Sequence, residues 1–351
     1  METDILIVGA GLSGLALARM LEAEGQNYLL VEARDRTGGR ISTVEVAGAR
    51  FDMGPAWFWP GQPRMAALVQ ELGLERFDQY FEGDLSYEDE SGQVQRGRGY
   101  ASMQGSYRLR GGLTSLTDAL AARLSEHRLR LNSQLTRLTD TGDTIVAQFA
   151  TGDPVSAKRV VLALPPRIAA EIAMVPPLPA TALTAMSSCA TWMAGQAKAV
   201  AVYETAFWRQ EGYSGDAMSR HGPMVEIHDA SPRDGGAFAL FGFIGIPSAH
   251  RRDRSQLNAA VLAQLGRIFG PKAADPIALH IKDWAFDPHT ATIADQQPPM
   301  SHPHYGLPPA MKGLWNDRLM LSGTETGHRF GGYLEGALEA AEISLARVKR
   351  G

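Results

Sequence analysis

The stretch Thr3-Asp-Ile-Leu-Ile-Val-Gly-Ala-Gly-Leu-Ser-Gly14, close to the start of the chain, decides its fold. Its apolar first half is typical of a strand that is buried on both faces. Glycines occupy positions 9, 11 and 14, and the residues that follow have the apolar periodicity of a helix, which Gly25 would end. The segment Asn27-Tyr-Leu-Leu-Val-Glu32 then predicts a second strand that ends in an acid.

This order of strand, glycine turn, helix and acidic strand end predicts a βαβ unit that binds a dinucleotide. Gly9 would make the tight turn, Gly11 would let the backbone approach the pyrophosphate, and Gly14 would let the helix pack on the strand. The helix N-terminus would present free N–H groups and the positive end of its dipole to the phosphates. Glu32 would accept hydrogen bonds from both adenosine ribose hydroxyls, which favours a ribose without a 2′-phosphate.

A second glycine pair follows in Ala33-Arg-Asp-Arg-Thr-Gly-Gly-Arg40. An NAD site has no standard need for this pair, whereas a flavin dinucleotide does, because a second glycine turn lets backbone reach its pyrophosphate. Arg40 would bind the pyrophosphate oxygens through its guanidinium group. Taken alone, the pair could also be a surface turn with solvated arginines.

Glycines return near the other end of the chain. Met320 ends a short apolar strand, Gly323 begins a turn, and the pair at 331–332 opens a helix that runs to about Val348. The N-terminus of this helix would stabilise negative charge on a reduced flavin. An ordinary capped terminal helix is the local alternative.

With these segments the chain resembles the flavin-containing monoamine oxidase family. The resemblance rests on 31–40, 51–57, 321–326 and 331–340, and on landmarks between them in the same order: Tyr107–Gly112, Leu131–Leu135, Val160–Pro166 and Ala206–Trp208. It implies an α/β fold (α+β overall), in which a Rossmann-like FAD-binding domain is interleaved with a substrate domain built on a mixed sheet plus helices.

Because both chain ends would hold the cofactor, the FAD-binding domain must be discontinuous. We predict that it consists of residues 1–60, 108–192 and 285–351, and that 61–107 and 193–284 form the substrate domain. The first insertion is much shorter than the helical insertion that the family usually has there. We therefore expect a more open substrate site, or one that a partner subunit closes.

The resemblance also implies which residues contact FAD. They are Gly9, Gly11, Leu12, Ser13, Gly14, Glu32, Ala33, Arg34, Gly39, Arg40, Gly54, Ala56, Trp57, Leu135, Gly323, Glu325, Gly332, Tyr333 and Leu334. The loop that carries a flavin-tethering cysteine in monoamine oxidases has no cysteine here, and Cys189 is far from it in sequence. The expected FAD is therefore non-covalent.

Lys198 is the first candidate catalytic residue. It alternates with alanines in a strand pattern and shares its face with Val200 and Val202. A lysine on an edge strand that reaches water is the structural alternative. The resemblance matches Lys198 to the family's active-site lysine, which holds a water next to the flavin and assists its reoxidation.

Tyr333 is the second candidate, because it matches one wall of the family's aromatic cage for the substrate amine. The second wall is missing, since Ile293 or Ala294 occupies its place. Replacement rings could come from Trp57, Phe58 and Trp59, of which Trp57 and Trp59 are candidate substrate contacts; all three could equally be core aromatics.

Composition excludes several other classes. The chain has 351 residues, 34 Lys plus Arg and 38 Asp plus Glu, for a net charge of -4, so nothing indicates a nucleic acid or a membrane as partner. A lone Cys189 excludes an internal disulfide and fits a reducing compartment, so we expect a cytoplasmic protein. His302 and His304 lack a carboxylate partner, and no metal site is expected.

The leading hypothesis is FAD-dependent oxidation of a small-molecule amine. Hydride would pass from the α-carbon to flavin N5, the imine would hydrolyse, and O2 or another acceptor would reoxidise the flavin. The alternatives are a flavin-dependent C–C desaturase or oxidase of a larger substrate, and a non-catalytic flavoprotein subunit of a complex. A homo-oligomer or a partner subunit stays open.

Overall fold

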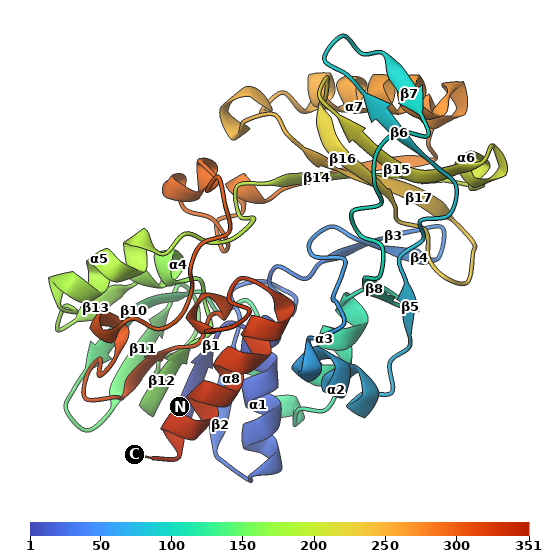
Figure 1. The fold of residues 1–351 in the computed structure, drawn as a ribbon. Coiled ribbons are helices and arrows are strands. Elements are labelled where there is room, and N and C mark those ends of the chain that lie inside the picture. The colour runs from blue at the N-terminus through green and yellow to red at the C-terminus, as the bar shows by residue number, and fades with distance from the viewer. Residues whose placement is uncertain (351) are drawn as a thin grey trace.

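The computed structural model describes residues 1–350, which form two parts, each built around its own β-sheet (Figure 1). The eight strands of the first sheet are β1 (Glu2–Val8), β2 (Tyr28–Val31), β9 (Leu129–Arg130), β10 (Leu135–Asp140), β11 (Ile145–Phe149), β12 (Val155–Leu162), β13 (Ala173–Val175) and β19 (Leu319–Leu321). Their order is β13-β10-β11-β12-β1-β2-β9, and β19 also pairs with β12.

The centre of this sheet is parallel. β1 pairs in parallel with β2 and with β12, and β12 pairs in parallel with β19. The carboxyl ends of these four strands, at Val8, Val31, Leu162 and Leu321, therefore lie at one edge of the sheet. Ligands of open parallel sheets bind at this edge.

Six α-helices belong to the same part of the molecule as this sheet. They are α1 (Leu12–Ala23), α2 (Pro63–Glu71), α3 (Thr114–Ala121), α4 (Pro166–Ala170), α5 (Ala180–Ser188) and α8 (Leu334–Val348). The first and last of them, α1 and α8, lie side by side on one face (Figure 1). Ser13 Oγ on α1 donates to the carbonyl of Ser322 just after β19, at 2.5 Å, which ties the two ends of the chain together.

The second sheet has seven strands in the order β18-β14-β17-β16-β15-β6-β7. They are β18 (Ala278–Asp283), β14 (Ala197–Tyr203), β17 (Phe238–Ile244), β16 (Met224–Asp229), β15 (Tyr213–Ser219), β6 (Asp84–Glu88) and β7 (Val94–Arg96). Helix α7 (Arg254–Phe269) packs on one face through Leu257, Val261 and Leu265. The other face packs against Phe51 and Trp57.

The remaining elements are short. Two small antiparallel sheets pair β3 (Thr43–Val46) with β4 (Ala49–Asp52) and β5 (Arg76–Asp78) with β8 (Tyr107–Leu109), and α6 spans Phe207–Gln210. The 3-10 helices are η1 (Glu126–Arg128), η2 (Ser248–His250), η3 (Pro271–Ala274), η4 (Trp284–Phe286), η5 (Ile293–Gln296), η6 (Pro309–Met311) and η7 (Thr324–Thr326).

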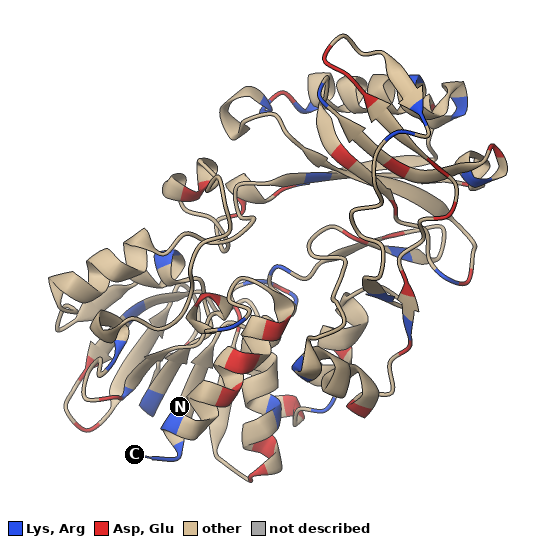
Figure 2. Ribbon diagram, viewed as in Figure 1, with Lys and Arg blue, Asp and Glu red and all other residues tan. Residues whose placement is uncertain are grey.

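The α/β fold class with mixed sheets is as predicted, while the exact domain division stays a prediction. Strands of the first sheet come from residues 2–31, 129–175 and 319–321, and those of the second from 84–96 and 197–283. Acidic residues recur along α8, whereas Lys and Arg are scattered over both parts (Figure 2). None of the helices described for residues 1–350 is long and apolar enough to span a membrane.

Candidate active site

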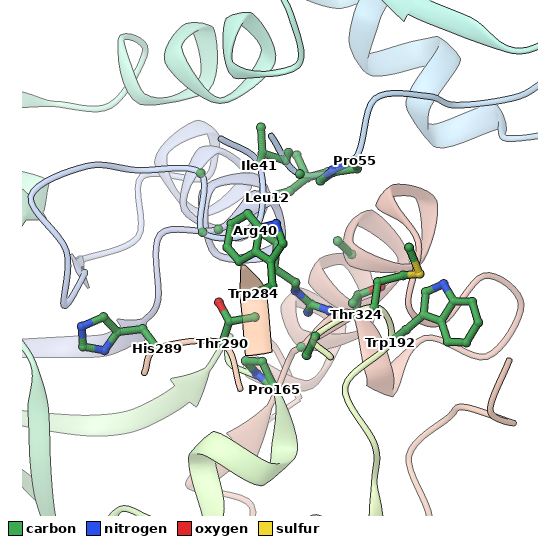
Figure 3. Close-up of a pocket in the computed structure, with 18 of the residues that line it drawn as sticks. Leu12, Arg40, Ile41, Pro55, Pro165, Trp192, Trp284, His289, Thr290 and Thr324 are labelled. Atoms are coloured by element: carbon green, nitrogen blue, oxygen red, sulfur yellow. The ribbon is translucent and has the colours of Figure 1, made fainter. Parts of the chain in front are cut away.

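A cavity of about 890 Å³ lies where the two sheets face each other. The carboxyl ends of β1, β2, β12 and β19 supply one wall, and β14, β16 and β17 supply residues of the other. Figure 3 shows side chains from separate segments meeting there, among them Arg40, Trp192, Trp284 and Thr324. Its volume is near the upper end of the ~300–1,000 Å³ that is usual for small-molecule sites.

The two glycine turns predicted from the sequence come together at this cavity. Gly38 N–H donates to the carbonyl of Ala10 at 2.8 Å, and Gly11 and Gly38 form an isolated parallel bridge. Gly9 has a φ of 103°, which only glycine adopts readily. A Cβ on Gly11 would find its nearest protein atom 3.9 Å away, so the space in front of this backbone is open.

Gly14 differs from its predicted role as a cofactor contact. It does not line the cavity, and a Cβ there would lie 1.9 Å from the carbonyl oxygen of Gly9. Its contribution is therefore the close packing of α1 on the first turn, which the sequence pattern also indicates.

Glu32 and Arg34 line the cavity at the end of β2. Glu32 Oε2 accepts a hydrogen bond from Ala10 N–H at 2.8 Å, and its Oε1 accepts one from Arg34 N–H at 3.0 Å. The Arg34 guanidinium binds Asp287 and donates to Thr290 Oγ1, so it also fixes the loop after η4. A carboxylate held in this way is preorganised to accept the ribose hydroxyls.

Arg40 lines the cavity, whereas Glu325 does not. Arg40 Nη1 lies 2.7 Å from Oε1 of Glu325, whose side chain is fully buried. Burial lowers the pKa of Arg40, but the Glu325 carboxylate outweighs this effect, and the net shift is upward. Glu325, predicted as a cofactor contact, instead positions Arg40 from behind.

Lys198 lies on β14, between β17 and β18, so the alternative of an edge-strand lysine is wrong. Its side chain is buried, Nζ donates to the carbonyl of Gly54 at 3.1 Å, and Nζ stands 3.9 Å from the ring centre of Phe241. Burial lowers the pKa of Lys198 to about 7, although the nearby Asp52 carboxylate opposes this shift. The amine is thus balanced between its two protonation states near neutral pH.

The aromatic side chains around the cavity do not form two parallel walls. Tyr333, at the N-cap of α8, meets Trp59 edge-on, with ring centres 6.2 Å apart and an angle of 87°. Another face of Tyr333 stacks on His302, at 5.0 Å and 15°. Ile293 and Ala294 are exposed and lie outside the cavity lining.

The three aromatic residues after Gly54 have different surroundings. Trp57 lines the cavity but also belongs to the core, and its Nε1 donates to Gln79 Oε1 at 2.8 Å. Phe58 is 1% exposed, packs on Tyr107 and does not line the cavity. Trp59 lines the cavity, so it is the better candidate for a second ring near Tyr333.

All other predicted cofactor and substrate contacts line the cavity. The sequence did not indicate several further lining residues: Ile41, Gln62, Met103, Trp192, Met193, Val225, Glu226, Phe243, Trp284, His289, Thr290 and Thr324. Ile41 and Thr324 adjoin the predicted glycine turns, and the others lie on strands, η helices and loops without glycine signatures. For the second sheet, the period-two pattern around Lys198 is the one sequence signal that a strand face points into a site. That pattern does not show which strands lie beside β14, so it could not identify Val225, Glu226 or Phe243.

The residues present fit FAD. Both glycine turns leave backbone open to the cavity, the N-terminus of α1 begins beside them, and Glu32 stands at the end of β2 where the adenosine ribose of a dinucleotide binds. Among residues 1–350, no group of three or more His, Cys, Asp or Glu side chains is placed to hold a metal ion.

Comparison with known proteins decides the family. Residues 12–100 and 77–348 match the family model described as flavin containing amine oxidoreductase. This chain belongs to that family. The amine oxidoreductase family is flavin-dependent, and the dinucleotide cradle of this member makes the cofactor FAD.

Relatives of this amine oxidoreductase match it over most of its length. They include a probable flavin-containing monoamine oxidase A of Dictyostelium discoideum (24% identity, 96% of this chain and 95% of the relative). Another is the putrescine oxidase of Kocuria rosea, with 25% identity over 82% of this chain and 83% of the relative. The first alignment extends over 445 positions, whereas this chain has 351 residues, so the relative has segments without a counterpart here.

Solved structures show the same fold. A wild-type putrescine oxidase bound to putrescine superposes with a TM-score of 0.84 at 21% identity, over 100% of both chains. Cyclohexylamine oxidase from Brevibacterium oxydans IH-35A has a TM-score of 0.83 at 20% identity, over 100% of this chain and 99% of the other.

Proposed function

We propose that this protein oxidises an aliphatic amine at the carbon next to nitrogen. The family, the FAD cradle and the buried Lys198 beside Gly54 support this reaction. When bound, FAD supplies the acceptor for the hydride that leaves the α-carbon. Water then hydrolyses the imine to a carbonyl compound and ammonia or a smaller amine. O2 is the proposed final electron acceptor.

Tyr333 and Trp59 would bind the reacting end of the substrate. Their rings line the cavity on the side where α8 begins, and an uncharged or partly charged amine binds favourably to the electron-rich face or rim of such rings. Because Tyr333 is fixed by its stack on His302, the amine would be held in one orientation.

Lys198 would hold a water molecule and donate a proton where the electron acceptor is reduced. Its Nζ has donors to spare beyond the bond to Gly54, because an ammonium carries three N–H groups. Cys189 does not line the cavity, which supports non-covalent binding of FAD.

The observation that carries the proposal is the burial of Lys198 on the cavity wall, facing the flavin cradle of an amine oxidoreductase. The test mixes flavin-loaded protein, without O2, with a panel of monoamines, diamines and amino acids. We expect at least one amine to remove the visible absorbance of oxidised flavin within minutes. A panel in which no compound does so would contradict the proposal.

A further inference from the structure

Glu226 is a cavity residue that the proposed reaction leaves without a role. It lies on β16, where it pairs with Phe243 of β17, and Phe243 in turn pairs with Lys198 of β14. Cross-strand partners share a face, so these three side chains form one row that lines the cavity. Two strand spacings place the Cα atoms of Glu226 and Lys198 about 10 Å apart.

An irregularity in β16 aims Glu226 at the cavity. The register between β16 and β17 shifts between Met224 and Glu226, as at a β-bulge. Met224 and Ile227 both belong to the core on the α7 side, and the extra residue lets Glu226 point the other way. With regular pairing, Val225 instead of Glu226 would stand opposite Phe243.

The buried His228 holds Glu226 in place. His228 Nε2 lies 3.0 Å from Glu226 Oε1, and His228 Nδ1 lies 2.9 Å from Asp216 Oδ1. Two carboxylate partners require N–H donors on both ring nitrogens, which is the imidazolium form. Burial lowers the pKa of His228, but its bonds to the two carboxylates outweigh this, and the net shift is upward.

One acceptor of Glu226 remains available. Ser102 Oγ donates to the same oxygen that faces His228, at 2.6 Å. The other oxygen, Oε2, has no protein hydrogen-bond partner among residues 1–350, and a quarter of the side chain is exposed toward the cavity. Burial raises the pKa of Asp216, whereas the hydrogen bonds from His228 and Ser102 outweigh burial and lower the pKa of Glu226, so the negative charge at this end of the cavity lies on Glu226.

We infer that Glu226 binds a second cationic group of the substrate, so that diamines and other amines with a distal cation are the preferred substrate class. This inference rests on the proposed function. The reacting amine lies at the Tyr333 end, the alkyl chain crosses the Phe243 ring, and the distal ammonium donates to Glu226 Oε2. A charge-assisted hydrogen bond in a partly dehydrated pocket supplies the selectivity.

The test compares three probes of equal chain length: 1,4-diaminobutane, butylamine and 4-aminobutanoate. Flavin-loaded wild type and Glu226→Gln are mixed with each probe without O2, and the concentration dependence of flavin bleaching gives an apparent Kd and a limiting rate. For the wild type we expect the cationic probe to bind tightest and the anionic probe weakest. In Glu226→Gln, the diamine should bind about tenfold or more weaker, while butylamine is unchanged.

Glu204→Gln is the matched control, because it removes the same charge from an exposed position at the end of β14. Retention of flavin and an unchanged thermal midpoint show that Glu226→Gln is folded. Equal loss of affinity for the diamine and butylamine, or no loss for either, would overturn the inference.

Failure of the proposed function has a different signature. In that case no probe bleaches the flavin, and the Kd of each probe is measured instead by calorimetric titration of the wild type and of Glu226→Gln. Tighter binding of 1,4-diaminobutane by wild type than by Glu226→Gln still supports the role of Glu226. Identical binding by the two proteins overturns it.

Discussion

Lys198 shows how burial prepares a residue for a chemical role. On the sheet face that lines the cavity, its amine is removed from bulk water. It contacts the carbonyl of Gly54 and the ring of Phe241 instead, and the nearby Asp52 carboxylate attracts its positive charge. Loss of hydration destabilises the charged form of the amine more than its neutral form, and the pKa of Lys198 therefore falls to about 7. Asp52 was not predicted as part of the site, although it directly precedes the Met53-Gly54 turn and is buried with its own pKa raised by burial.

We therefore predict a pH-dependent step that disappears in Lys198→Met. With O2 as acceptor, the charged amine below pH 7 stabilises developing negative charge, so the rate at which visible flavin absorbance recovers falls as pH rises through about 7. In Lys198→Met the recovery should be about tenfold to a hundredfold slower and independent of pH between about 6 and 8. Stopped-flow spectrophotometry of prereduced protein measures it.

Lys272→Met is the control, since it removes a lysine that is exposed on η3. This variant should keep both the rate and the pH dependence of the wild type. Recovery in Lys198→Met that retains the wild-type pH profile would show that another group titrates in this step.

At the scale of elements, Glu335 of α8 binds the N-terminus of α2. The fully buried Glu335, in the first turn of α8, accepts hydrogen bonds from the backbone N–H groups of Arg64 and Met65, at 3.1 and 2.8 Å. These are two of the unpaired donors at the N-terminus of α2. The contact fixes the start of residues 61–107 against the terminal helix.

We predict that Glu335→Ala lowers the free energy of unfolding by about 2 kcal/mol, because one buried and one partly buried backbone N–H group lose their acceptor. Thermal and urea unfolding of flavin-loaded protein measure the loss. Glu342→Ala is the control: Glu342 also binds Arg64, but only its exposed side chain, and its removal should cost at most about 1 kcal/mol. Equal losses in both variants would show that the ion pairs with Arg64, and not the backbone bonds, stabilise α2.

The elements differ in how far the sequence predicts them. The glycine turns, the strands beside them and α8 were predicted, because φ values and close backbone approaches at Gly9 and Gly14 restrict these positions to glycine. Glu226 was missed for a physical reason. Whether its side chain points into the cavity depends on the register of β14, β17 and β16 and on the irregularity after Met224. Neither can be predicted from the residue pattern of a single strand.

For the molecule as a whole, the cradle joins segments from both ends of the chain. The turn after β1 and the turn after β19 line one cavity, so bound FAD links α1, α8 and the loops between the sheets. A ligand that binds only the folded state stabilises it, by about 2.7 kcal/mol at a hundred times its Kd. Stability and cofactor affinity can therefore be measured in the same experiment.

We predict that FAD added to flavin-free wild type raises its thermal midpoint in proportion to the logarithm of FAD concentration. Gly11→Ala should have the wild-type midpoint without FAD, because its Cβ meets no protein atom closer than 3.9 Å, but should need far more FAD for the same rise. Gly14→Ala should melt lower even without FAD, because its Cβ would collide with Gly9. A Gly11→Ala protein with wild-type FAD dependence would contradict this placement of the cofactor.

The irregularity in β16 has a consequence for the evolution of this enzyme. Glu226 belongs to the second sheet, whereas the glycine turns that hold FAD belong to the first. Loss of the single residue Glu226 would restore regular pairing and place Val225 opposite Phe243 on the cavity wall, without altering the flavin cradle. A one-codon deletion could thus change which substrates are accepted while the flavin still reacts. Substrate selectivity and flavin binding can therefore evolve separately.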